Sequence, residues 1–60
     1  MTKNFSGFKV TFNPIKRELR VYGLALYVYP NISIEEVEDL ENWSDMDLRN
    51  FMKQNECYRK

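Results

Sequence analysis

The feature that most constrains the fold is a strict alternation of apolar and polar residues in two neighbouring stretches. Residues 8–13 and 18–22 each place an apolar side chain at every second position, which is typical of a half-buried β-strand. Only residues 14–17 separate the two stretches. Asn13 and Pro14 favour a type I turn there, because the proline ring fixes φ and the Asn side chain bonds backbone amides downstream. The two stretches are therefore predicted to form an antiparallel hairpin.

A third apolar stretch, Leu24–Tyr29, follows Gly23 and stops at Pro30. A glycine within a β pattern marks either a tight turn or a bulge. A tight turn makes the stretch the third strand of a meander, which we favour, whereas a bulge makes it part of one long bent strand. Because the glycine can shift the alternation, the sequence leaves open which face of the sheet carries Tyr27 and Tyr29.

The stretch Leu24–Tyr29 also carries no charge and has high β propensity. As an exposed edge, such a strand would invite pairing with another chain. Two arrangements remain open. The strand lies centrally or against the helices, or its edge is completed by a second copy in a homodimer or by a partner strand.

The second half of the chain is predicted to form two short helices. Ser33 stands three residues before Glu36, and Ser44 three before Asp47, so each serine is predicted to begin a helix with a capping box. Asn55 is predicted to be the left-handed C-cap of the second helix. Apolar residues recur at helical spacing: Ile34, Val37, Leu40, Trp43, Leu48, Phe51 and Met52. The predicted fold class is α+β, a three-stranded antiparallel meander followed by two helices packed on one face (β-β-β-α-α).

Length and composition predict one small binding domain. The domain spans residues 1–60, with structure expected from about residue 6 to residue 56 and frayed ends. The chain has no histidine and one cysteine, Cys57, which removes the commonest general base, any Ser-His or Cys-His pair and an internal disulfide. We therefore expect no enzyme activity, no catalytic residue, no metal site and no cofactor. The sequence also lacks a signal-peptide run and an apolar stretch of the ~20 residues that span a bilayer, so we expect a cytoplasmic protein with no membrane contact.

Several short motifs follow one another through the middle of the chain. In order they are Asn13-Pro14-x-Lys16-x-Glu18-Leu19-x-Val21, Gly23, Tyr27-Val28-Tyr29 and Glu35-Glu36-Val37. Together they resemble the KTSC domain, a small module found alone in bacterial proteins and at the C-terminus of some lysyl-tRNA synthetases. The Tyr-x-Tyr pair is the best marker of that family, and the resemblance covers about Phe8 to Tyr58. It implies RNA binding, although the chain lacks the family's longer loop before this pair, the glycine of its Ser-x-Gly stretch and its basic tail.

The formal net charge is zero, but the charges are unevenly distributed. Residues 1–34 carry five basic and one acidic side chain, a net of +4, whereas residues 35–60 carry four basic and eight acidic ones, a net of −4. The helix dipole explains acids in a first helical turn, but not those further along. The acidic face predicted to bind a partner consists of Glu35, Glu36, Glu38, Asp39 and Glu41.

The first functional hypothesis assigns this acidic face to protein binding. A small adaptor or inhibitor would dock with it on a larger protein that presents a basic surface. The alternative is that the five acids form an ordinary solvated helix face.

The second hypothesis is that the sheet binds RNA or single-stranded nucleic acid. If the apolar side chains of the hairpin face the helices, their neighbours face water. Basic residues beside aromatic rings on an open sheet hold single strands, because rings stack on bases and cations meet phosphates. The candidate residues are Lys9, Arg20, Tyr22, Tyr27 and Tyr29. The alternative is that Tyr27 and Tyr29 close the core with their rings and reach solvent only with their hydroxyls.

Overall fold

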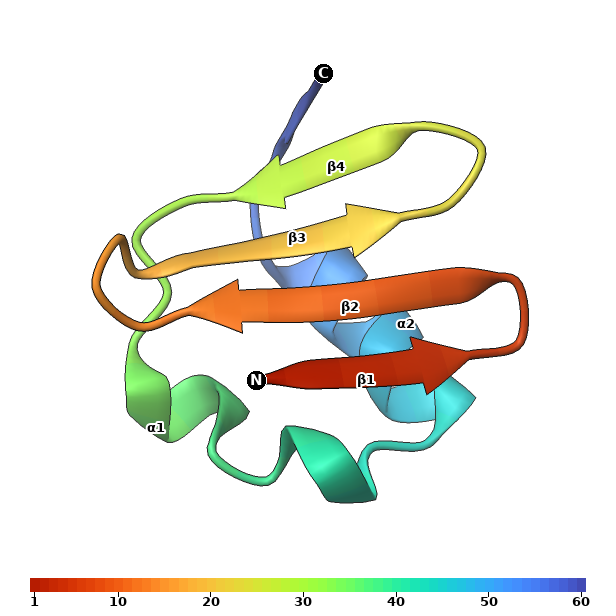
Figure 1. Cartoon of the computed structure of the whole chain (residues 1–60), viewed down its shortest axis with the longest axis horizontal. Coiled ribbons are helices and arrows are strands. Elements are labelled where there is room, and N and C mark those ends of the chain that lie inside the picture. Colours follow the sequence, from red (N-terminus) through yellow and green to blue (C-terminus); the bar gives the residue numbers. More distant parts are fainter.

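A computed structural model describes all 60 residues as a five-stranded antiparallel sheet with helices on one side (Figure 1). The strands lie in chain order: β1 (Thr2–Phe5), β2 (Phe8–Asn13), β3 (Glu18–Tyr22), β4 (Leu26–Tyr29) and β5 (Tyr58–Arg59). The helical elements between β4 and β5 are α1 (Ile34–Val37), the 3-10 helix η1 (Leu40–Asn42) and α2 (Asp45–Gln54). Figure 1 shows α2 crossing behind the sheet and the opposite face of the sheet without any covering element.

The α+β class, the antiparallel meander and the two helices are confirmed, but the predicted number of strands is wrong. Two further strands lie at the ends of the chain, where fraying was predicted. β1 pairs with β2 from Thr2↔Thr11 to Phe5↔Phe8 across a turn in which Gly7 adopts φ 83°. β5 pairs with β4 over two residues only. β1 is polar at three of its four positions and β5 has only two residues, so no apolar alternation reveals them.

Gly23 forms a tight turn, as predicted. Its N–H donates to the Ala25 carbonyl at 3.0 Å, and β3 and β4 pair from Leu19↔Tyr29 to Tyr22↔Leu26. A Cβ at Gly23 would lie 3.0 Å from the ring of Phe8, so the ring packs over the bare glycine backbone. The turn therefore fixes the register of β4, and with it the face on which each β4 side chain lies.

β4 is an interior strand, because β3 and β5 pair with its two sides. The uncharged stretch therefore does not present an open edge to a second copy of the chain. The sheet ends instead at β1 and at the two-residue β5, which is followed by Lys60. Short and charged edges of this kind disfavour strand pairing between molecules.

The hydrophobic core lies between the sheet and the helices. It contains ten buried residues: Val10, Phe12, Leu19, Val21, Tyr29, Ile32, Val37, Leu40, Leu48 and Phe51. The ring of Phe51 meets Tyr29 edge-on and lies against Trp43, with both pairs of ring centroids 5.3 Å apart. Ile34, which was expected in the apolar stripe of the first helix, is exposed instead.

Only one of the two predicted capping boxes forms. Ser44 Oγ accepts from the Asp47 N–H at 3.2 Å, and Asp47 Oδ2 accepts from the Ser44 N–H at 2.8 Å, as predicted. The prediction is wrong at Ser33, whose side chain makes no capping hydrogen bond. The helix after Ser33 stops after four residues, so little helix remains there for a cap to stabilise.

None of the helices is long and apolar enough to cross a membrane.

The predicted left-handed cap at Asn55 is also wrong. Asn55 has extended backbone angles, φ −126° and ψ 147°. Its side-chain Nδ2 donates to the Phe51 carbonyl at 2.9 Å, which satisfies one of the free carbonyls at the end of α2. The extended backbone then leads the chain toward β5.

Candidate functional site

The uncovered face of the sheet gathers the side chains that alternate with the core residues. Directly paired positions lie on the same face of a sheet, so the register defines two rows across it. The first row is Thr2, Thr11, Arg20, Val28 and Tyr58. The second row is Asn4, Lys9, Tyr22 and Leu26. The predicted residues Lys9, Arg20 and Tyr22 therefore lie together on this face.

The structure places the other two predicted nucleic-acid residues on the opposite face. Tyr29 pairs with Leu19 and Tyr27 with Val21, so both tyrosines face the helices. Tyr29 is 1% exposed, and Tyr27 packs against the core. The prediction that they share a surface with Lys9 is wrong; they close the core, as the alternative held. Burial raises the pKa of Tyr29, and the nearby Cys57 thiol adds a smaller contribution.

Tyr58 is a surface aromatic residue that the sequence did not reveal. β5 places it beside Val28 on the uncovered face, and it is 47% exposed. Val28 is completely buried although no helix lies over it. Its paired neighbours on this face are Arg20 and Tyr58, which account for that burial. We call the four residues Tyr22, Leu26, Val28 and Tyr58 the tyrosine patch.

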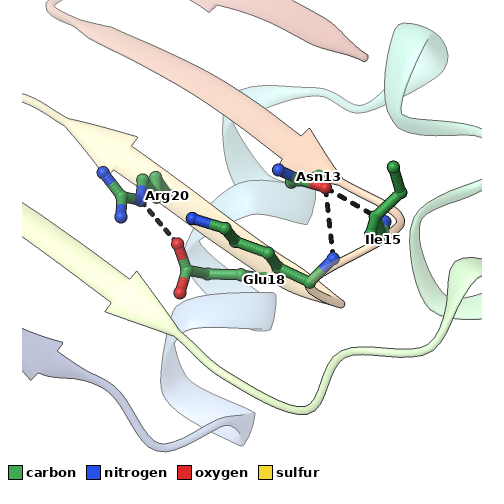
Figure 2. Close-up of polar contacts among 5 residues, drawn as sticks. Asn13, Ile15, Glu18 and Arg20 are labelled. Atoms are coloured by element: carbon green, nitrogen blue, oxygen red, sulfur yellow. Dashed lines mark hydrogen bonds and ion pairs between the residues drawn. The ribbon is translucent and has the colours of Figure 1, made fainter.

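Beside the tyrosine patch lies a polar hollow of about 260 Å³, open to solvent, which we call the hairpin hollow. Its lining residues are Thr11, Asn13, Lys16, Glu18, Arg20 and Tyr22. The chain's one ion pair crosses it, from Arg20 Nε to Glu18 Oε1 at 2.6 Å (Figure 2). This hydrogen bond raises the pKa of Arg20, and the nearby Tyr22 hydroxyl adds to the effect. Arg20 is therefore charged at any ordinary pH, and Glu18 holds its guanidinium in place.

The turn at the end of the hairpin fixes the remaining wall of this hollow. Asn13 Oδ1 accepts from the N–H groups of Ile15 and Lys16, at 3.0 and 3.2 Å (Figure 2). The chain closes the turn at Arg17, which adopts φ 55°. These two bonds occupy the side-chain oxygen of Asn13. They hold the side-chain NH₂ group of Asn13 at the rim of the hollow.

Positive charge predominates on the uncovered face. The backbone N–H of Lys60 donates to the Leu26 carbonyl at 2.8 Å, which continues the alternation of β5 and places Lys60 on this side. This face therefore carries four cations and one acid, Glu18, which is already paired with Arg20. The cations are Lys9, Lys16, Arg20 and Lys60.

The acidic residues predicted to bind a protein partner do not form one helix face. All five are exposed, but they are distributed over α1, the connecting residues and η1: Glu35, Glu36, Glu38, Asp39 and Glu41. None forms an ion pair. η1 lies against β1, where Lys3 Nζ donates to the backbone carbonyl of Glu41 at 2.6 Å. The carboxylates consequently follow an irregular ridge along the β1 side of the molecule.

One further hollow contains none of the predicted residues. This second hollow, of about 290 Å³, lies between the β1–β2 turn and α2. Its lining residues are Ser6, Phe8, Asp45, Leu48, Arg49 and Met52. No three Asp, Glu or Cys side chains are arranged so that they could hold a metal ion.

No family model matches the chain, and neither the curated proteins nor the solved structures contain a match to it. The resemblance to the KTSC domain therefore stays a prediction. The strand register places Tyr22, which the sequence predicted, and Tyr58, which it did not, on this surface.

Proposed function

We propose that the protein binds single-stranded nucleic acid on the uncovered face of its sheet. The observation that carries the proposal is the register that brings Lys9, Arg20 and Tyr22 onto one face, with Tyr58 beside them. Such a face combines rings that can stack on bases with cations that can meet phosphates. The resemblance to the KTSC domain, which implies RNA binding, agrees with the proposal.

The tyrosine patch supplies the stacking surface. Tyr22 is 39% exposed and Tyr58 is 47% exposed, so each side chain is partly packed against its neighbours and partly accessible to a ligand. Stacking of a base on such a ring contributes about 1–3 kcal/mol. Tyr22 and Tyr58 lie two strands apart and are offset by two residues along the strands. Their Cα atoms are therefore roughly 12 Å apart. The two tyrosines would therefore hold different bases of the same strand.

The distribution of charge supports this proposal in spite of the zero net charge. Lys9 is paired directly with Tyr22, and Lys60 lies two residues beyond Tyr58. Each ring thus has a cation beside it for the phosphate of the stacked nucleotide. Of the eight unpaired acids, seven lie within residues 35–47, on the helical elements and their connections, and Glu56 precedes β5. Because charges are screened over about 10 Å at 0.1 M salt, the local excess of cations decides which surface attracts a phosphate.

The proposal is tested by reversing one charge on this face and one elsewhere. A labelled single-stranded oligonucleotide of mixed sequence is titrated with protein at low salt and followed by fluorescence anisotropy. Lys9→Glu should weaken binding strongly. The matched control, Lys53→Glu, changes an exposed lysine on α2 and should have little effect. Equal loss in both variants, or no binding by the wild-type protein, would refute the proposal.

The exposed acids favour a second candidate function, docking on a protein with a basic surface. The specific observation is that five neighbouring carboxylates make no ion pair within the chain. Charge reversal at Glu38 and Glu41 should abolish capture of a basic partner from a cell lysate. The same reversal should leave nucleic-acid binding intact. If the captured protein has no basic surface, this candidate loses its physical basis.

A further inference from the structure

Arg20 lies near the centre of the uncovered face with only part of its guanidinium occupied. Its Nε donates to Glu18 (Figure 2), and the side chain makes no other hydrogen bond. A guanidinium carries five N–H donors in a rigid fork. The two terminal nitrogens therefore keep their N–H groups for a ligand, with the Tyr22 hydroxyl close to the guanidinium. The side chains of Arg20 and Glu18 are only 28% and 16% exposed, so their neighbours hold both in place.

The carboxylate of Glu18 makes this fork poorly suited to a phosphate. It neutralises the charge of Arg20 and would repel a phosphate brought to the same place. A neutral base with two adjacent acceptor atoms meets no such repulsion. The second carboxylate oxygen of Glu18 can also accept an N–H from the same base.

The neighbouring groups of the hairpin hollow reinforce this preference. The Asn13 carbonyl oxygen is occupied by two backbone amides, so only the amide hydrogens of Asn13 remain to bond a ligand. Lys16 is likewise a donor. The hollow thus presents several donors and one carboxylate acceptor.

We propose that the hairpin hollow selects guanine within the bound single strand, with Arg20 as the residue that determines the specificity. Guanine offers O6 and N7 as paired acceptors for an arginine fork, and its N–H groups match a carboxylate. Adenine and cytosine instead present an amino group where guanine has O6. That amino group is a donor and would meet the N–H donors of Arg20 without forming a hydrogen bond. This inference rests on the proposed function, because it concerns a base of the strand that the sheet would bind.

The test uses three oligouridylates that differ only in one central nucleotide: guanosine, adenosine or 7-deazaguanosine, which lacks the N7 acceptor. Fluorescence anisotropy at low salt should show about tenfold tighter binding of the guanosine strand, as a bidentate arginine contact provides. Arg20→Lys keeps the charge but removes the fork, so it should bind all three strands equally. The control Lys9→Ala should weaken all three by the same factor and preserve the preference.

The outcomes separate this inference from the proposed function. If the wild-type protein binds the three strands with equal affinity, the guanine preference is refuted and single-strand binding stands. If it binds none of them, both proposals fail. The comparison among the strands needs only wild-type protein, so it remains decisive even if Arg20→Lys does not fold. If folded Arg20→Lys keeps the full preference for guanosine, Arg20 is not the specificity residue.

Discussion

Lys9 and Tyr22 lie directly opposite each other on β2 and β3, on the face of the sheet that no helix covers. The pair places a cation beside an exposed ring at the centre of the proposed interface. Tyr58 and Lys60 give β5 the same combination of ring and cation. The proposal therefore depends on two such combinations rather than on the net charge of the chain.

Loss of a stacking ring should weaken nucleic-acid binding. Tyr22→Ala is expected to cost about 1–3 kcal/mol of binding free energy, as does loss of an aromatic ring stacked on a base. Tyr22→Phe keeps the ring and should bind nearly as well as the wild type. Anisotropy titrations of the two variants measure the difference. An equal loss in both would mean that the hydroxyl, and not the stacked ring, holds the ligand.

Salt should weaken binding only moderately. Three lysines of the uncovered face have no acidic partner: Lys9, Lys16 and Lys60. If each meets a phosphate, log K should fall with log salt concentration at a slope of about −2. Lys9→Ala should reduce the slope by about 0.7, because one contact is lost. A slope that is unchanged in this variant would remove Lys9 from the interface.

Alkaline pH should destabilise the fold through Tyr29. The pKa of Tyr29 is raised by burial, so the unfolded chain releases this proton first. Stability is complete below about pH 10 and falls above it, by up to about 1.4 kcal/mol per pH unit, until the folded-state pKa is reached. Thermal unfolding of the wild type and Tyr29→Phe at pH 8 and at higher pH measures the effect. Tyr29→Phe should abolish most of the loss of stability at high pH, whereas the control Tyr22→Phe should retain it. If Tyr22→Phe abolishes the loss and Tyr29→Phe retains it, another group causes the alkaline destabilisation.

The two serines at helix starts should differ in their contributions to stability. Ser44→Ala removes a formed capping box and should lower the free energy of unfolding by about 1 kcal/mol. Ser33→Ala removes no capping bond and should be nearly neutral. Urea unfolding of the two variants gives the comparison. Equal destabilisation would mean that Ser33 caps α1 in solution.

The aromatic cluster around Phe51 should be the most sensitive part of the core. Phe51→Ala removes the ring that contacts both Tyr29 and Trp43 and should cost about 3–5 kcal/mol. Because a domain of this size has a stability of only a few kcal/mol, the variant should be largely unfolded. Ile15→Ala, at a fully exposed turn position, should be neutral. Circular dichroism shows whether each variant is folded. A folded Phe51→Ala would mean that the ring of Phe51 is not essential to the core.

The strands that the sequence predicted are β2 and β3, which alternate, and β4, which is an uncharged apolar stretch between Gly23 and Pro30. β1 is as long as β4 but polar at three of its four positions, and β5 has only two residues, so only pairing with a neighbour reveals them as strands. Tyr58 could not be assigned to the site for that reason. The face of Tyr27 and Tyr29 depended on the register that the Gly23 turn imposes, which the residue types alone do not determine.

The helix signals show a similar limit. Ser33 and Ser44 have the same capping motif, yet only the helix after Ser44 reaches ten residues. A cap contributes about 1 kcal/mol, which is too little to extend a helix whose side chains must follow the core. The acidic residues consequently lie on a ridge instead of a helix face, because α1 ends at Val37.

The most direct test of the central claim is an amide chemical-shift map, recorded by nuclear magnetic resonance while a short single-stranded oligonucleotide is added. If the uncovered face binds the strand, the largest shifts should fall on β2, β3 and β5, around Lys9, Tyr22 and Tyr58. Residues of α1 and η1 should change little. Shifts confined to residues 34–42, or no shifts at low salt, would contradict the claim.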